Sequence, residues 1–107
     1  MNSEIKKILN KQPAKLIFFG HEYSVVFDRS RLTKDENGKV KNWAESLPAH
    51  NIIIMAEDIP DDYIIPVLIH ECIEIINWHF GLELPHQTIS VFETALFSIL
   101  EDNKLRQ

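Results

Sequence analysis

The chain has 107 residues, of which 45% are hydrophobic and three are glycine, a composition typical of one globular domain with a modest core. Its formal charge of −5, with lysines spread along the polar segments, argues against binding to nucleic acid, which needs Lys and Arg gathered on one face. The single cysteine, Cys72, excludes an intrachain disulfide and fits a reducing cytoplasm.

The N-terminal residues and the apolar runs bear on targeting. Residues 1–15 lack the apolar core of a signal peptide, and no run reaches the roughly 18 uninterrupted apolar residues of a membrane span. We therefore expect a soluble, unprocessed, cytoplasmic protein without a membrane partner. We predict one domain over residues 1–107, with a core within 14–103 and a short helix within 1–12.

The first third of the chain predicts a helix and a hairpin. Ser3–Leu9 has a short amphipathic pattern that Pro13 ends. The β-rich runs Leu16–Phe19 and Tyr23–Phe27 are joined by Gly20-His21-Glu22, which predicts two antiparallel strands. Residues 29–48 are polar and contain the turn pair Asn37-Gly38, so they predict a long excursion, with a short strand at its end as an open alternative.

The second half of the chain predicts one strand and two helices. Asn51–Met55 is a β-branched run typical of a buried strand, and an acidic turn follows it. The next pattern predicts a helix over Tyr63–Phe80, with Asp62 as its N-cap and Gly81 after its end. A second helix is expected over His86–Asp102. The predicted fold class is α+β, with a small sheet (the hairpin plus a further strand) packed on two main C-terminal helices.

The segment His70-Glu71-Cys72-Ile73-Glu74 of the first helix resembles the H-E-x-x-H signature of metal hydrolases, in which two ligands four residues apart flank a catalytic Glu. Here Glu74 stands in place of the second His. At about 100° per residue, Asn77, Glu74 and Glu71 lie about −20°, +40° and +100° from His70, so these polar groups share one arc. His79 lies on the opposite side and is a poor ligand candidate.

A third ligand has to come from elsewhere in the chain, and the second helix offers His86 and Glu93 on one face. Position along an antiparallel neighbour favours Glu93, whereas ligand type and charge favour His86, which we rank first. His70, Glu74 and His86 together make two imidazoles and a carboxylate with one open position, as in several catalytic zinc sites. Manganese or iron also accept this set. Glu71 would then serve as the general base of peptide or amide hydrolysis.

A competing interpretation makes His70, Glu71 and Glu74 a solvated polar stripe on an amphipathic helix. The corresponding alternatives are that His86 merely begins a helix, and that Glu93 is a surface carboxylate or one that contacts a metal ligand rather than the metal. The pair His21-Glu22 has no ligand four residues on, and we assign it no chemistry. Cys72 is predicted to be a buried apolar residue. Four large side chains of the two helices are predicted to be core residues rather than substrate contacts: Trp78, Phe92, Phe97 and Leu100.

The pattern resembles the small zincin-like proteins encoded by phages and prophages, which are usually described as metallopeptidases. The resemblance covers roughly residues 19–103 and is carried by several segments: Tyr23-Ser24-Val25-Val26, Asn51-Ile52-Ile53-Ile54, Leu68-Ile69-His70-Glu71, Ile75-Ile76-Asn77, Leu82-Glu83-Leu84-Pro85-His86, Ile89 and Leu100-Glu101-Asp102-Asn103. Such proteins look like minimal zincins, in which the active helix follows the last strand of a small sheet. The resemblance makes His70 a metal ligand and Glu71 the base.

Glu74 departs from the pattern of this family, and two interpretations stay open. In the first, Glu74 and His86 exchange places, which keeps two imidazoles and one carboxylate around zinc and gives a metal-dependent hydrolase of peptidase type acting on a peptide or protein. In the second, catalysis has decayed, and the chain is a non-catalytic phage accessory or protein-binding module, with or without a structural metal. A toxin-like or regulatory protein acting on one host target is a third possibility.

Overall fold

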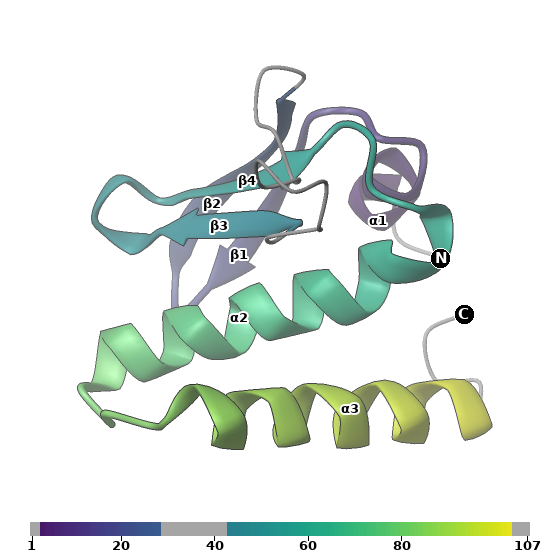
Figure 1. Cartoon of the computed structure of the whole chain (residues 1–107). Helices are drawn as coiled ribbons and strands as arrows, with labels where there is room; N and C mark the ends of the chain where they lie inside the picture. The colour runs from purple at the N-terminus through teal and green to yellow at the C-terminus, as the bar shows by residue number, and fades with distance from the viewer. Residues whose placement is uncertain (1–2, 29–42, 104–107) are drawn as a thin grey trace, which may run out of the picture.

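A computed structural model of the chain describes residues 3–28 and 43–103 and confirms the α+β class (Figure 1). A four-stranded mixed sheet lies on one side, and two long helices pack together below it. The elements in chain order are α1 (Ser3–Leu9), β1 (Ala14–Phe18), β2 (His21–Asp28), β3 (Ala44–Leu47), the 3-10 turn η1 (Pro48–His50), β4 (Ile52–Ala56), the 3-10 turn η2 (Asp61–Tyr63), α2 (Ile64–Phe80) and α3 (His86–Asp102).

The predicted hairpin is present, but its turn differs from the prediction. β1 and β2 pair antiparallel from Ala14 opposite Val25 to Phe18 opposite His21. The turn is therefore Phe19-Gly20, and both residues have positive φ angles, 51° and 80°. Two successive residues with positive φ match the right-handed twist of a hairpin, which explains the glycine. His21 and Glu22 belong to the strand and not to the turn.

The strand order is β1-β2-β4-β3, so the sheet is not a simple meander. β4 pairs parallel with β2 and antiparallel with β3, which makes β3 an edge strand. β3 confirms the short strand at the end of the polar excursion, whose earlier residues, 29–42, lie outside the described ranges and include the turn pair Asn37-Gly38. In the β3 register, Ala44 lies opposite Met55 and Ser46 opposite Ile53, two buried core residues. Ser46 therefore faces the helices.

The main core lies between the sheet and α2. Alternate residues of the strands are buried and meet one side of α2, because successive side chains of a strand point to opposite faces. Its largest fully buried members are Ile53, Met55, Ile59, Ile64 and Ile75, and Ile8 of α1 joins them. α3 packs on α2 and lies on the side of α2 away from the sheet (Figure 1).

The bounds of α2 and α3 lie close to those predicted, but the predicted N-cap of α2 is wrong. Asp62 is not an N-cap, because residues 61–63 form η2 and Tyr63 precedes the first α-helical residue without any side-chain capping bond. Pro66 lies in the first turn of α2, where its missing N–H costs little. Gly81 has φ +60° and its N–H bonds the carbonyl of Trp78, a left-handed end that favours glycine.

The prediction of a core position is wrong for two residues, Trp78 and Phe92. Trp78 is 56% exposed and Phe92 is 48% exposed, whereas Phe97 and Leu100 are partly buried. The reason is tertiary: α3 has a helical neighbour on one side only, so it buries Ile89 and leaves much of its apolar surface open. No helix within residues 3–28 and 43–103 is both long and apolar enough to cross a membrane.

Candidate metal centre

A pocket of about 420 Å³ opens where the edge strand β3 passes the polar arc of α2 and the first turns of α3. The β3 segment contributes Trp43, Ala44, Glu45 and Ser46, α2 contributes Val67, His70, Glu71 and Glu74, and α3 contributes His86 and Glu93. Three elements far apart in sequence thus converge. The structure brings every residue of the predicted site, including the runner-up ligand, into one cavity.

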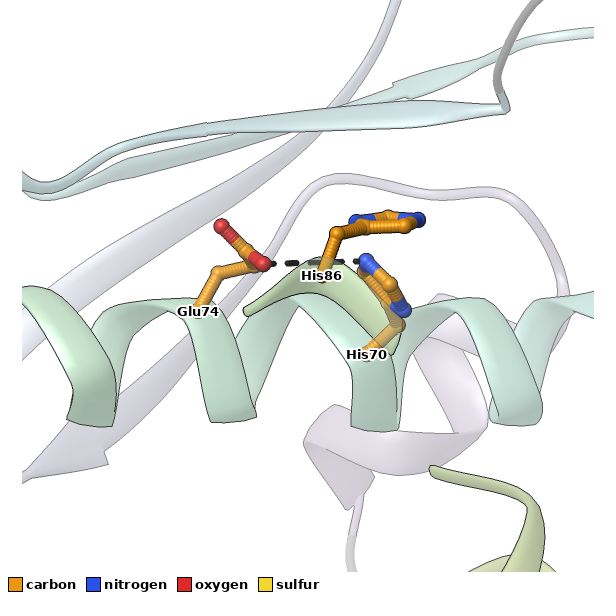
Figure 2. Close-up of side chains that lie close together, drawn as sticks. All are labelled: His70, Glu74 and His86. Carbon is orange, nitrogen blue, oxygen red and sulfur yellow. Dashed lines mark ion pairs between the residues drawn. The ribbon is translucent and has the colours of Figure 1, made fainter. Parts of the chain in front are cut away.

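His70, Glu74 and His86 form the donor set that a metal ion requires. Each offers one ligand atom, and these atoms all lie within 4.8 Å of one another. Figure 2 shows the two α2 side chains, one helical turn apart, and the His86 ring beside them. The rings of His70 and His86 have centroids 5.0 Å apart and are inclined by 57°.

The spacing fits an ion between the three side chains. Ligand atoms around tetrahedral zinc stand about 3.3 Å apart, given bonds of about 2.0–2.1 Å. His70 Nε2 and Glu74 Oε1 are 3.9 Å apart, too far for a hydrogen bond to each other and close to the distance that a shared ion needs. His86 is exposed, so its side chain can rotate to close the remaining gap. The residues present therefore fit a divalent cation.

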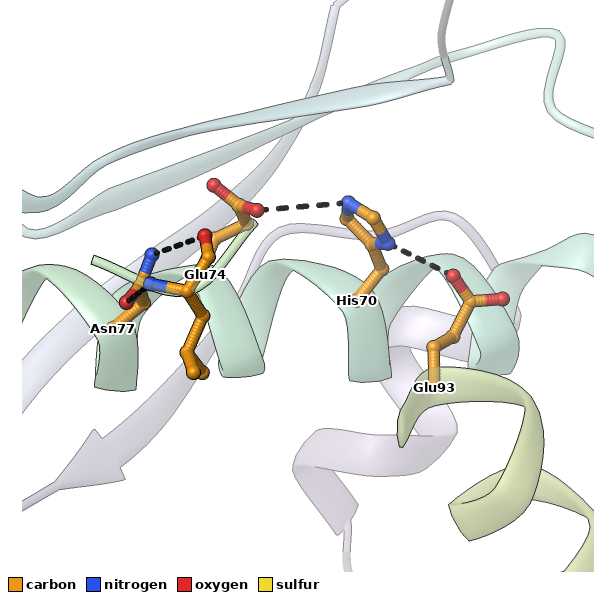
Figure 3. A network of polar contacts seen from close by, with 5 residues as sticks. His70, Glu74, Asn77 and Glu93 are labelled. Carbon is orange, nitrogen blue, oxygen red and sulfur yellow. Dashed lines mark hydrogen bonds and ion pairs between the residues drawn. The ribbon is translucent and has the colours of Figure 1, made fainter. Parts of the chain in front are cut away.

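Glu93 lies at the site but on the far side of His70. Its Oε1 is 2.9 Å from Nδ1 of His70, as Figure 3 shows. An ionised carboxylate only accepts hydrogen bonds, so Nδ1 donates to Glu93, and in the neutral ring this leaves the Nε2 lone pair on the side of Glu74. Carboxylates often hold the histidine ligands of metals in this way. Glu93 is thus placed to orient His70 rather than to be the third ligand, and the preference for His86 agrees with the geometry.

Asn77, the fourth member of the polar arc, has a different task. Its Oδ1 accepts the backbone N–H of Leu84 at 2.8 Å, and its Nδ2 lies 3.5 Å from the Leu84 carbonyl (Figure 3). This pair of contacts ties the connection between the helices to the end of α2, two residues before His86. Helix periodicity placed Asn77 on the polar face but did not predict this contact, because its partner is a backbone group in the connection after the helix.

Glu71 is buried, with 7% of its surface exposed, and lies in the same pocket. Burial raises the pKa of its carboxyl above the usual value, and the nearby charges of Glu74 and Glu45 act in the same direction. His70 and a hydrogen bond from the Ser46 side chain oppose that rise in pKa. The solvated-stripe interpretation is therefore wrong for Glu71, and Ser46 is a contact that only the sheet register reveals.

The other residues considered from sequence lie elsewhere. His79 stacks on Phe19, with ring centroids 5.0 Å apart, and does not belong to the donor set. Glu22 pairs with Lys15 at 3.6 Å on the surface. Cys72 is a free, partly buried thiol, and burial raises its pKa to about 12, so a thiolate ligand is disfavoured at neutral pH.

Comparisons with protein-family models, curated proteins and solved structures give no match for this chain. The resemblance to small zincin-like phage proteins therefore stays a prediction. The fold and the geometry of the pocket carry the functional argument by themselves.

Proposed function

We propose that the protein is a metal-dependent hydrolase of peptidase type, with His70, Glu74 and His86 as the ligands of one divalent cation, most simply zinc. The observation that carries this proposal is the convergence of the three donor atoms, within 4.8 Å, beside the buried carboxylate of Glu71 in one pocket. Two imidazoles and one carboxylate are a common ligand set of catalytic zinc and leave room for a further ligand.

Each residue has a distinct part in the proposed reaction. A bound divalent cation supplies a Lewis acid that polarises a carbonyl and acidifies water. Glu71 accepts a proton from the water that attacks the carbonyl carbon, then donates it to the amine nitrogen as the C–N bond breaks. Its burial and raised pKa support this role, because a carboxylate that binds a proton more readily is a stronger base. Ser46 holds the Glu71 carboxyl by a hydrogen bond.

The arrangement around His70 supports the same proposal. Glu93 directs the Nε2 lone pair into the pocket through its bond to Nδ1, and the Asn77 contacts with Leu84 hold the segment that delivers His86. Each of the two proposed histidine ligands is thus supported by a polar contact, which a row of solvated side chains would not need. Glu74 stands where the signature has its second histidine, and in this proposal His86 supplies the missing imidazole.

The test is metal-dependent cleavage of a mixed peptide library, analysed by mass spectrometry. We expect zinc-loaded protein to hold one zinc per chain and to cleave library peptides, and Glu71→Gln to keep the zinc while losing about 10²–10⁴-fold in rate. The matched control is Glu22→Gln, which alters the corresponding residue of the exposed His-Glu pair and should leave the rate unchanged. Failure to bind zinc under metal-replete conditions would rule the proposal out.

A second candidate function is a non-catalytic protein-binding module, and the surface of α3 favours it. Val91, Phe92, Leu96 and Ile99 are each between 44% and 59% exposed. Phe92, Leu96 and Ile99 follow the spacing of one helix face. One bound zinc per chain without cleavage of any library peptide would favour this second function.

A further inference from the structure

The helix α3, which forms the outer layer of the molecule in Figure 1, has a second apolar side besides the one that packs on α2. Ile89 is buried and marks the side toward α2. At about 100° per residue, Phe92 and Ile99 lie on either side of a direction about 90° from Ile89. Leu96 and Val91 lie about 70° to either side of that direction. The four exposed large apolar side chains of α3 therefore share one arc.

The middle of this arc has the spacing of a seam between two helices. Four residues follow one another at intervals of four, three and four positions, as in coiled coils, and we call them the outer seam: Thr88, Phe92, Ala95 and Ile99. His86 and Glu93, the residues of α3 that line the candidate metal pocket, lie about 130–150° from the middle of the outer seam. A helix packed along the outer seam therefore stays off the pocket side of α3.

The order of side chains along the outer seam fits a second copy of α3 that runs in the opposite direction. When Phe92 of one copy lies opposite Ala95 of the other, Ile99 lies opposite Thr88, and a two-fold axis repeats both contacts. Each large side chain then meets a small one, so the two helices can interdigitate. A parallel pair in register would place Phe92 against Phe92 and Ala95 against Ala95, which crowds one level and leaves a gap at the next.

The charge at the end of α3 agrees with the antiparallel register. Asp102 lies on the same arc, is exposed, and stands at the C-terminal end of the helix, where the helix dipole disfavours an anion. In the antiparallel register, Asp102 lies opposite Pro85 of the second copy, just before the first residue of its α3. As the structure describes α3, its first turn holds no acidic residue and Pro85 makes no side-chain capping bond. A carboxylate from a second copy is stabilised at that end.

We propose that two copies of the chain pair through their outer seams, antiparallel across a two-fold axis. This inference is independent of the proposed hydrolase activity, and it assigns the exposed face of α3 to a second copy rather than to a different protein. The four large side chains of the arc are each between 44% and 59% exposed. At roughly 200 Å² per side chain, two copies bury about 800 Å² of them, which is typical of a weak, concentration-dependent dimer.

The test is sedimentation equilibrium of the whole chain between about 5 and 500 μM, with zinc and separately with a chelator. We expect a monomer at the low end and a dimer at the high end in both conditions, with a dissociation constant on the order of 10 μM. Phe92→Ala removes the large side chain and Ala95→Phe sets two large ones against each other, so each should weaken the dimer at least about tenfold. Both changes in one chain restore a large residue opposite a small one and should return the dissociation constant to within about threefold of wild type.

The matched control is Thr94→Phe, which adds the same ring at an exposed position about 130° from the outer seam and should leave the dissociation constant unchanged. All three positions are exposed, so the fold of each variant should stay as in wild type, which circular dichroism checks. A monomer at the highest concentration would overturn the inference. A dimer that forms only with zinc would also overturn it, as would equal effects of Thr94→Phe and Ala95→Phe or a double variant that pairs no more tightly than the single ones.

Discussion

The chain contains the dipeptide His-Glu twice, in a strand and in a helix, and the two copies have different surroundings. His21-Glu22 begins β2 at the hairpin turn, where both residues are exposed and Glu22 pairs with Lys15. His70-Glu71 lies in the middle of α2, where the His70 side chain is 15% exposed and Glu71 is buried. The residues are the same, but their neighbours differ.

The difference shows what a dipeptide needs to become a site. A helix places position i+4 beside position i, so Glu74 reaches His70, whereas a strand turns successive side chains to opposite faces. α3 then adds His86 and Glu93, and β3 adds Ser46. His21 instead lies beside the ring of His79, with centroids 6.0 Å apart.

The largest expected effect is on metal binding. His70→Ala removes the proposed ligand that Glu93 contacts at Nδ1 and Glu74 approaches at Nε2, so we expect zinc content to fall from one per chain to below about one-tenth. His21→Ala, the same change in the strand copy, should leave one zinc per chain. Zinc is measured by mass spectrometry after dialysis against a weak chelator. Equal losses in both variants would mean that the helix copy is not a metal site.

Glu93 should have the next largest effect. Glu93→Ala removes the acceptor that holds His70 Nδ1 at 2.9 Å, and we expect zinc affinity to fall about 10–100-fold while the stoichiometry stays at one. Glu93→Gln keeps a neutral acceptor and should lie between the alanine variant and wild type. The measurement is competition with a chromophoric chelator. A complete loss of zinc in Glu93→Ala would instead assign Glu93 as a ligand.

Asn77 should affect both stability and the metal. Asn77→Ala removes the two contacts with Leu84, and we expect the free energy of unfolding to fall by about 1–2 kcal/mol. Zinc affinity should fall less than in Glu93→Ala, since His86 is still present but less firmly held. The control is Asn10→Ala, because the Asn10 side-chain amide donates to the carbonyl of Lys6, four residues earlier in the adjoining helix α1, at an exposed position. Chemical denaturation and the same chelator competition measure both quantities.

The smallest effect concerns the pH dependence of stability in the metal-free protein. Burial raises the pKa of Glu71 in the folded state, so folding favours its protonated form. The cost of folding with an ionised Glu71 is absent below the unfolded pKa of about 4.3 and grows as the pH rises through it. Glu71→Gln should therefore be more stable than wild type at pH 7, with a difference that closes toward pH 4.

The control for this measurement is again the strand copy. Glu22→Gln breaks an exposed ion pair with Lys15, which contributes between about 0 and 1 kcal/mol, so it should lower stability slightly or not at all. Thermal unfolding at several pH values gives the comparison. A Glu71→Gln variant that is less stable than wild type at pH 7 would contradict the buried, raised-pKa carboxyl.

Much of the fold was predictable because local patterns agree with the tertiary structure. The bounds of α1 and α3 match the predictions from sequence, and Gly81 ends α2 in the left-handed conformation expected of it. The first turn of α2 was harder to predict. Asp62 looks like an N-cap by residue type, but the 3-10 turn η2 precedes the helix and leaves Asp62 inside that turn.

The candidate site was predictable only in part. The arc of His70, Glu71 and Glu74 follows from helix periodicity, and His86 follows from the ligand type that a zinc set lacks. For Glu93 the sequence left open a ligand and a carboxylate that contacts a ligand, since the choice depends on how α3 packs on α2 and so on the 2.9 Å contact of Glu93 with Nδ1 of His70. Ser46 did not follow either, because its direction depends on the register of β3 against β4.

The sequence by itself determined the α+β class, the two long helices and the shared face of the central polar residues, because each depends on neighbours a few positions apart. The tertiary structure decided the parallel pairing of β2 with β4, the exposure of Trp78 and Phe92, and the convergence of β3, α2 and α3 on one pocket. These features depend on packing between distant segments, which local periodicity does not encode.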